Sequence, residues 1–362
     1  MESQLMQIYA HDRHAFATRA LGGLPEGLPF PSVDVTAVQA LLSQCPIAKP
    51  TPLIDATALA RILGIARLSI KDERNRMGLG SFKALGAAYA IARDAKLTGA
   101  ADLSKALAGR VYVTASAGNH GLSVAAGARI FGAQSCIYIA ESVPASFEQR
   151  LAEAGAQVRR EGRIYEESMA AAERAGQQDS WHLLSDSAWV SHIDPAFFVM
   201  EGYLAMAEEA HQQIAAPPTH IFLQAGVGGL AGAVAAYARH VWSDAPKIVV
   251  VEPDAAPALQ ASVQAGAFTP TTGPVSNMGR LDCKEASWIA LKGLYRDADF
   301  FVTLSDEFVE KALVQLADHA LNASPSGAAG VAALFADETA RSELGLDASA
   351  RALCILSEGP AA

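Results

Sequence analysis

One lysine stands in a local sequence that suits chemistry at its amine. Lys83 follows Ser81-Phe82 and precedes the small, apolar run at 84–88. A helix that begins with so few polar side chains looks buried, and burial lowers the pKa of a lysine and makes its amine nucleophilic. Such an amine can form a Schiff base with a carbonyl group. Most single lysines on helices are solvated surface residues, so the role of Lys83 depends on its partners.

A second segment suits anion binding. Ser116-Ala117-Gly118-Asn119-His120 lies between an apolar run at 111–114, which predicts a strand, and an amphipathic run at 122–131, which predicts a helix. A strand-to-helix turn leaves backbone amides free to bind an anion. We expect these amides and the Ser116 hydroxyl to hold an amino-acid carboxylate. The alternative is an ordinary helix N-cap formed by Ser116 or Asn119.

A third segment is rich in glycine. Gly226-Val227-Gly228-Gly229-Leu230 follows a predicted strand at 220–223 and begins a predicted helix, so its amides can bind a phosphate. The segment also fits the dinucleotide pattern, with Glu252 at the end of the next strand, where a ribose-binding acid would stand. An NAD-dependent oxidoreductase is therefore one interpretation, but it leaves the other two segments unexplained.

Together the three segments predict one cofactor, pyridoxal phosphate (PLP). Its aldehyde would join the amine of Lys83, its phosphate would bind the glycine-rich segment, and an amino-acid substrate would place its carboxylate on residues 116–120. Such a cofactor does the electronic work of the reaction, while the protein decides which bond breaks.

Composition limits the class of protein. The chain has 362 residues, of which 51% are hydrophobic and 18% charged, enough for one large domain or two modest ones. Its net charge of −10 argues against nucleic acid or an anionic membrane as the main partner. No signal peptide and no apolar run of about 18 residues is evident, so we expect a cytoplasmic protein. The four cysteines lie far apart without ligand spacing and predict reduced thiols and no metal: Cys45, Cys136, Cys283 and Cys354.

Strand and helix patterns alternate along most of the chain, which is typical of a parallel α/β fold. We expect strands at 68–70, 111–114, 135–139, 220–223, 247–251 and 352–356. Helices are expected at 84–95, 122–131 and 230–241. A smaller lobe of βα units, from about residue 85 to 185, could be inserted into a larger sheet domain.

These segments and their order resemble the fold-type II PLP-dependent enzymes, the tryptophan synthase β-like group that includes threonine and serine dehydratases, cysteine synthase and serine racemase. The resemblance runs from Thr51-Pro52-Leu53 to Leu356-Ser357-Glu358-Gly359. Within the group the chain is most similar to the diaminopropionate ammonia-lyases, at 71–79 with Phe82-Lys83, at 186–189, at 223–228 and at 251–254. The resemblance implies a large PLP-binding domain with a parallel sheet, residues 1–84 and 190–362, and a smaller inserted α/β domain, residues 85–189.

The resemblance also implies roles for single residues. Lys83 would carry the cofactor as a Schiff base and later move protons at the substrate α- and β-carbons. Asn119 would donate a hydrogen bond to the phenolic oxygen of the cofactor, and Gly226, Val227, Gly228, Gly229 and Leu230 would bind its phosphate. Ser357 would face the pyridine nitrogen, where a neutral hydroxyl leaves that nitrogen unprotonated and suits β-elimination over transamination. The alternative for Ser357 is a plain turn after the last strand.

Two positions bear on the substrate, and a third bears on a metal ion. The ammonia-lyases have an aspartate where this chain has Ala117, which cannot move a proton or bind a second amine, while threonine dehydratases share the whole Ser-Ala-Gly-Asn-His run. Asp186 keeps the other acid of the ammonia-lyase pattern and could assist the leaving group, although a helix N-cap is its alternative role. Ala258 replaces an acid of the cation site found in serine racemase-like enzymes, so we expect no required metal.

The sequence therefore predicts a PLP-dependent lyase that removes the β-substituent of an L-amino acid and yields a 2-oxo acid and ammonia. A 3-hydroxy amino acid such as serine, threonine or phenylserine is the favoured substrate, and the aromatic residues Trp189, Phe197 and Phe198 would tolerate a large substituent. Diaminopropionate ammonia-lyase activity is the alternative, followed by PLP-dependent β-replacement and by the NAD-dependent oxidoreductase. Many relatives are dimers, so a homodimer is possible.

Overall fold

The computed structural model describes residues 6–17 and 20–360. The chain forms two compact units. The larger comprises Met1–Val33, Pro50–Asn75 and Met206–Ala362, and the smaller comprises Asp34–Lys49 and Arg76–Ala205. This division differs from the sequence-based one, because 34–49, 76–84 and 190–205 also belong to the smaller unit. The physical reason is helix packing: α3 (Lys83–Leu97) packs against α4 (Asn119–Ile130) and α7 (Asp194–Gly202).

The larger unit is built on a seven-stranded sheet whose two outer strands run antiparallel to their neighbours and whose inner strands are parallel. The inner strands are buried on both faces, which explains their nearly continuous runs of Val, Ile and Leu. In spatial order the strands are β1 (Met6–Ala10), β10 (Phe300–Leu304), β9 (Lys247–Pro253), β8 (His220–Gln224), β11 (Arg351–Leu356), β3 (Arg67–Asp72) and β2 (Leu53–Asp55).

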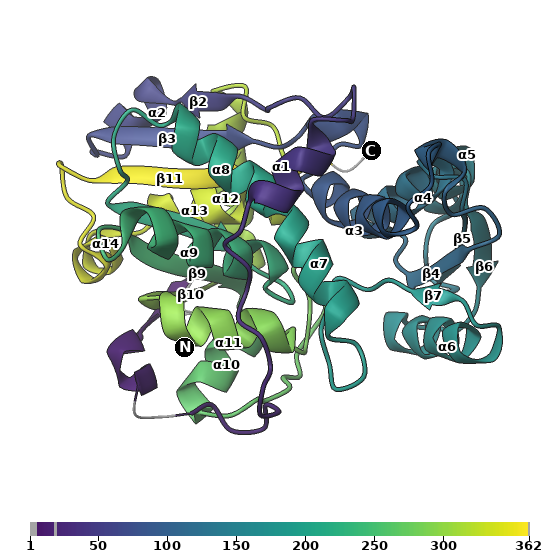
Figure 1. The fold of residues 1–362 in the computed structure, drawn as a ribbon. Helices are drawn as coiled ribbons and strands as arrows, with labels where there is room; N and C mark the ends of the chain where they lie inside the picture. The colour runs from purple at the N-terminus through teal and green to yellow at the C-terminus, as the bar shows by residue number, and fades with distance from the viewer. Residues whose placement is uncertain (1–5, 18–19, 361–362) are drawn as a thin grey trace. The chain divides into compact units, whose positions relative to one another are not determined.

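Helices cover both faces of this sheet (Figure 1). One face packs on α13 in a core that includes Phe222, Val249 and Cys354. On the other side the alanine-rich α9 packs beside β8 and against α11, and the small side chains of α9 allow this close approach. The helices are α2 (Thr57–Ile62), α9 (Gly229–Trp242), α10 (Ala258–Ala265), α11 (Trp288–Asp297), α12 (Asp306–Ala317), α13 (Pro325–Ala332) and α14 (Glu338–Leu344), with α8 (Leu204–Gln213) at the unit boundary.

The smaller unit has a parallel four-stranded sheet in the order β6 (Gln157–Arg160), β5 (Gln134–Ile139), β4 (Val111–Ala115) and β7 (His182–Leu183). Alternate residues such as Val113 and Tyr138 face α6 (Tyr165–Gln178), and α4 lies on the opposite side (Figure 1). Helices α1 (Thr36–Leu42) and α5 (Ala145–Glu153) complete the unit. Because both faces of this sheet are covered by helices, functional residues are expected in the loops that follow the carboxyl ends of its strands.

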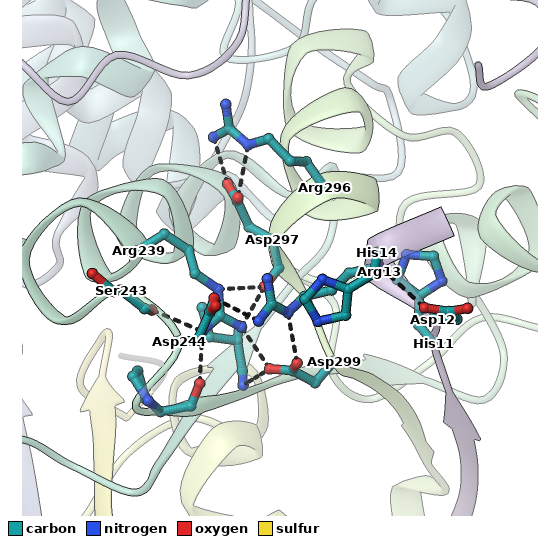
Figure 2. A network of polar contacts seen from close by, with 12 residues as sticks. His11, Asp12, Arg13, His14, Arg239, Ser243, Asp244, Arg296, Asp297 and Asp299 are labelled. Carbon is teal, nitrogen blue, oxygen red and sulfur yellow. Dashed lines mark hydrogen bonds and ion pairs between the residues drawn. The ribbon is translucent and has the colours of Figure 1, made fainter. Parts of the chain in front are cut away.

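An ion-pair network attaches the N-terminal segment to the larger unit (Figure 2). The guanidinium of Arg13 contacts Asp299 at 2.9 Å and Asp244 at 2.6 Å. Asp299 also accepts a hydrogen bond from Arg239 at 2.6 Å and one from the backbone N–H of Ile248 at 2.7 Å. The network thereby fixes the segment after β1 to the end of α9 and to the first residues of β9 and β10.

No helix within residues 6–17 and 20–360 combines the length and the apolar character needed to cross a membrane.

Candidate active site

Lys83 is the first residue of α3, and its amine forms an ion pair and a short hydrogen bond with the carboxylate of Asp186. The two residues are 103 positions apart in the chain. Burial alone would raise the pKa of Asp186, but the charge of Lys83, aided by His120, holds it well below its usual range. The lysine side chain is 22% exposed and has a counter-ion. The helix start is buried as expected, at 84–87, but the amine itself is partly exposed, and the neighbouring carboxylate favours its charged form.

A tight loop between β7 and α7 holds Asp186 in place. The N–H of Ser185 donates to Nε2 of His192 at 3.2 Å, and the N–H of Ser187 donates to the hydroxyl of Ser185 at 3.2 Å. The His192 ring stacks on Trp189 with 4.5 Å between ring centroids. Burial lowers the pKa of His192 to about 4, so the ring is neutral and its Nε2 can accept. No helix begins within 187–193, so the N-cap alternative for Asp186 is wrong.

The Ser-Ala-Gly-Asn-His segment leads from β4 into α4, as expected, although the helix begins earlier than predicted, at Asn119. Its N-cap is Gly118, and no side chain caps the helix, so the N-cap alternative for Ser116 and Asn119 is wrong. A side chain at position 121 would put Cβ 2.0 Å from the carbonyl oxygen of Ser116, so Gly121 is required by close backbone approach. The amides at this turn remain candidates for binding a carboxylate.

His120 joins this segment to the lysine cluster. Its Nε2 lies 2.8 Å from the carbonyl oxygen of Leu184, so Nε2 carries the hydrogen and Nδ1 is the acceptor. Nδ1 is buried and has no hydrogen-bond partner within the described part of the chain. Burial lowers the pKa of His120, and the charge of Lys83 lowers it further against the opposing effect of Asp186. A neutral imidazole with a buried, unsatisfied acceptor suits a site that a ligand completes.

Tyr203 belongs to the same cluster and was missed by the sequence analysis. Its ring packs on Phe82 with 4.8 Å between centroids, and its phenol is buried. Burial raises the pKa of Tyr203, while the charge of Lys83 opposes this shift. The available signal was Gly86 on α3, where any Cβ would lie 2.6 Å from the tyrosine ring. The other aromatic residues expected near a substrate make local contacts: Phe197 packs on Phe198, and the guanidinium of Arg93 lies over Phe198.

In the larger unit, the glycine-rich segment forms the turn from β8 into α9. Gly228 is the N-cap residue and has a φ of 97°, a left-handed conformation that favours glycine. A Cβ at Gly226 would lie 2.9 Å from Sγ of Cys283 and 3.1 Å from the carbonyl oxygen of Arg280. Both glycines therefore let the backbone run where side chains cannot fit. The first amides of α9 have no helical partners, and this donor set fits the phosphate of PLP.

Ser357 follows β11 and is buried. Its Oγ accepts a hydrogen bond from the side-chain amide of Gln224 at 3.0 Å, and the same amide donates to the carbonyl oxygens of Gly327 and Ile355. Because the Ser357 oxygen accepts here, its own hydrogen can be donated elsewhere. A hydroxyl that can donate fits the predicted contact with an unprotonated pyridine nitrogen. Ser357 also lies in the turn after the last strand, so the two interpretations are compatible.

Glu252 does not fit a ribose-binding acid. Its two carboxylate oxygens accept hydrogen bonds from the backbone N–H groups of Leu259 and Gln260, each at 2.8 Å, at the start of α10. Burial raises the pKa of Glu252 to about 8 against the effect of these two bonds. The acid is occupied as a helix cap, which removes the main support for the NAD interpretation. Among the described residues no group of three or more His, Cys, Asp or Glu side chains could hold a metal ion.

Known proteins are similar to this chain in sequence and in architecture. A model of the family described as "Pyridoxal-phosphate dependent enzyme" matches residues 45–358. Diaminopropionate ammonia-lyase of Salmonella typhimurium is 31% identical over 342 residues, with 85% of each chain covered. L-serine dehydratase/L-threonine deaminase of Mus musculus is 27% identical over 288 residues, which cover 79% of this chain and 82% of the mouse protein.

Solved structures of related enzymes are similar to this chain in fold. Diaminopropionate ammonia-lyase of Escherichia coli, crystallised in complex with D-serine, superimposes with a TM-score of 0.87 and 26% identity over 98% of this chain and 94% of that one. Threonine deaminase isoform 2 of Solanum lycopersicum, at 20% identity and a TM-score of 0.77, shares the fold. The predictions of the fold and of the cofactor are confirmed. The chain belongs to the family of pyridoxal-phosphate-dependent enzymes, with the architecture of fold type II, and pyridoxal phosphate is its cofactor.

Proposed function

We propose that this enzyme is a lyase that eliminates water from a 3-hydroxy L-amino acid such as serine, threonine or phenylserine. The α-hydrogen and the β-hydroxyl leave as water, and the resulting enamine takes up water to give a 2-oxo acid and ammonia. The observation that carries the proposal is the ion pair of Lys83 with Asp186, which places one transferable proton and one fixed negative charge together. The ammonia-lyase and dehydratase names of the relatives support the same class of reaction.

Each cofactor contact has a residue in this chain. Lys83 would form the covalent link, Gly226–Leu230 would bind the phosphate through their amides, and Ser357 would donate to the ring nitrogen. Asn119 would donate to the phenolic oxygen. PLP, when bound, withdraws electrons from the α-carbon of an attached amino acid and so makes the α-proton acidic.

The ion pair assigns the proton transfers. Because the pKa of Asp186 is held low, its carboxylate stays ionised at neutral pH and the proton of the pair resides on Lys83. As a neutral amine Lys83 would accept the α-proton, and the resulting ammonium, paired with Asp186, would deliver that proton to the departing hydroxyl. Asp186 would hold that hydroxyl and the ammonium in line.

The preference for a hydroxyl substituent follows from residue 117. Ala117 offers neither a base nor a carboxylate to bind a second substrate amine, so the carboxylate-binding turn 116–120 carries no negative charge of its own. A neutral 3-hydroxy group needs no counter-ion there.

A second candidate is diaminopropionate, because the Salmonella typhimurium ammonia-lyase shares 31% identity over 85% of this chain. Asp186 could serve as the counter-ion for the second amine of that substrate. The two candidates differ in the charge of the leaving group, and therefore in their dependence on position 117.

Substrate profiling tests the proposal. Purified holoenzyme is mixed separately with L-serine, L-threonine, L-threo-phenylserine and 2,3-diaminopropionate, and ammonia and the 2-oxo acid are measured. We expect turnover of at least one 3-hydroxy amino acid to exceed that of diaminopropionate. Robust turnover of diaminopropionate alone would contradict the proposal. In that case Ala117→Asp, with Ala117→Asn as an uncharged control, shows whether a negative charge at this position increases the turnover of diaminopropionate.

A further inference from the structure

Tyr203, at the end of α7, carries a buried hydroxyl that has no hydrogen-bond partner within the described residues. The side chain is 1% exposed, and burying a hydroxyl without a partner costs free energy. The smaller unit is described throughout, and each of its other buried tyrosines has a polar partner. Tyr89 donates to Glu201 at 2.8 Å, Tyr112 donates to Asp94 at 2.7 Å, and Tyr138 accepts from Arg159 at 3.0 Å. The unpaired phenol of Tyr203 is the exception, and folding does not explain it.

The packing of the ring places this hydroxyl over the first turn of α3. Phe82 directly precedes Lys83 and contacts the ring of Tyr203, with 4.8 Å between the two centroids. A Cβ at Gly86 would lie 2.9 Å from Cζ of Tyr203, the ring atom that bears the hydroxyl. Residues three apart on a helix share a face, so Gly86 and Lys83 lie on the same side of α3. The hydroxyl end of Tyr203 therefore lies on the face of α3 that carries the Lys83 side chain.

The charges around the phenol leave its hydrogen in place. Burial raises the pKa of Tyr203, and Lys83 and Asp186 are the two ionised groups that act on it, in opposite directions. His120 on α4 and His192, in the loop that holds Asp186, complete the set of titratable groups, and burial lowers the pKa of both. At neutral pH the two imidazoles are therefore uncharged, and the phenol keeps a hydrogen that it can donate.

The acceptor that suits this hydrogen is the amine of Lys83 in its neutral form. An ammonium has hydrogens and no lone pair, so in the ion pair with Asp186 it can accept nothing. Once Lys83 has lost its proton, its nitrogen has a lone pair to which a phenol can donate. Asp186 favours the charged ammonium, whereas a hydrogen-bond donor favours the neutral amine. The two groups therefore act on the Lys83 proton in opposite directions.

We propose that Tyr203 is a further catalytic residue, whose phenol donates a hydrogen bond to the neutral amine of Lys83 and so favours the form that can accept a proton. When the amine becomes an ammonium, the phenol oxygen accepts a hydrogen bond from it instead. The part that Tyr203 plays in turnover rests on the proposed function. Its effect on the amine does not, because Lys83 must also be neutral to join the aldehyde of PLP.

Thermal unfolding of the apoenzyme tests whether the hydroxyl is kept for folding. Tyr203→Phe removes the hydroxyl and preserves the ring. Tyr89→Phe is the matched control, since Tyr89 is equally buried and also packs between α3 and α7, but its hydroxyl is bonded to Glu201. We expect Tyr203→Phe to leave Tm unchanged or to raise it, and Tyr89→Phe to lower it by about 2–4 °C. A fall of equal size in both variants, or failure of Tyr203→Phe to fold, would overturn the proposal, because an unpaired hydroxyl has no bond to lose.

The pH dependence of the rate at which PLP joins the apoenzyme tests the effect on the amine. The rate is followed by the absorbance of the attached cofactor, and the signal should be absent in Lys83→Ala. Without the phenol, Lys83 needs a higher pH to lose its proton, so we expect the inflection for Tyr203→Phe to move up by about one pH unit. The inflection for Tyr89→Phe should stay at its native pH. An unchanged inflection for Tyr203→Phe, or one at lower pH, would overturn the proposal.

The pH profile of turnover separates this inference from the proposed function. With a substrate found by the profiling described above, the acidic limb of kcat should move to higher pH in Tyr203→Phe and stay in place in Tyr89→Phe. No amino acid is present in the PLP assay, so its result does not depend on the dehydratase activity. A shifted PLP inflection without turnover of any 3-hydroxy amino acid would overturn the proposed function and support the role of Tyr203 at the amine.

Discussion

Gly226→Ala gives a direct test of how the glycine-rich turn is positioned. The added Cβ would lie 2.9 Å from Sγ of Cys283, 3.1 Å from the carbonyl oxygen of Arg280 and 3.1 Å from Cα of Leu281. Two of these three atoms belong to the main chain and cannot rotate away. The backbone of Gly226 is outside the left-handed region, so alanine is not excluded by its dihedral angles. The whole effect of the substitution is therefore steric, and the turn or its support must move by a few tenths of an ångström.

The size of the effect follows from this contact. Forcing an extra methyl group into a packed interior costs about 1–3 kcal/mol. If about 1.4 kcal/mol of that strain opposes closure of the turn on the phosphate, the dissociation constant of PLP rises about tenfold. The remainder lowers the free energy of unfolding and shifts Tm downward by about 2–4 °C per kcal/mol.

The assay is titration of apoenzyme with PLP, accompanied by thermal unfolding. Gly279→Ala is the matched control, because it directly precedes the residues that contact Gly226, and its nearest atom, the carbonyl oxygen of Ser276, is 3.9 Å from the added Cβ. Adding Cys283→Ala to Gly226→Ala removes the sulfur contact alone, so we expect partial recovery. Native PLP affinity together with native Tm in Gly226→Ala would refute the reasoning.

Asp186→Asn should lower kcat by about 10²–10⁴-fold through loss of the Lys83 counter-ion, measured as ammonia release; a drop of the same size in the exposed Asp194→Asn would speak against a specific role. Because the pKa of His192 is lowered in the folded protein, the unfolded state binds a proton on this ring at a higher pH than the folded state does. The neutral ring therefore contributes at most about 3 kcal/mol of stability, which is complete above pH 6.5 and declines as the pH falls toward 4. Urea unfolding at several pH values should show this decline in the native protein and less of it in His192→Gln, and parallel curves for the two would contradict it. Arg13→Ala should reduce the free energy of unfolding by about 1–2 kcal/mol, because Asp299 loses a partner, while Arg163→Ala, from an exposed pair with Glu167, should change it little; equal urea midpoints for both variants would show that the N-terminal network is not stabilising.

The inner strands could be predicted from the sequence because burial on both faces requires apolar residues along their whole length. All six expected strands lie within observed ones, for example 247–251 within β9, since strands buried on both faces are runs of apolar residues. The edge strand β6 (Gln157–Arg160) has one half-buried residue and three exposed ones, and β7 has only two residues. Such short, exposed sequences cannot be told from loops, because they become strands only by pairing with a neighbouring strand.

The candidate site, too, has parts that local sequence motifs predict and parts that they do not. The glycine-rich turn and the Ser-Ala-Gly-Asn-His segment are local motifs, and the structure places both between a strand and a helix, as expected. The pairing of Lys83 with Asp186 joins residues 103 positions apart, and no local pattern encodes it. Tyr203 packs on Phe82, 121 positions away, and the loop that brings His192 to Ser185 has no regular sequence pattern, so both residues became visible only with the fold.

The antiparallel strand β1 has a consequence for biosynthesis. Residues 6–10 leave the ribosome long before their partner β10, and Arg13 is 286 positions from Asp299. Until β10 has been made, β1 has no partner strand, and β10, once made, is an open sheet edge until β1 docks. Closure of that edge has to wait until β10 has been made, so loss of β1 should leave β10 available to pair with other chains and promote aggregation during expression.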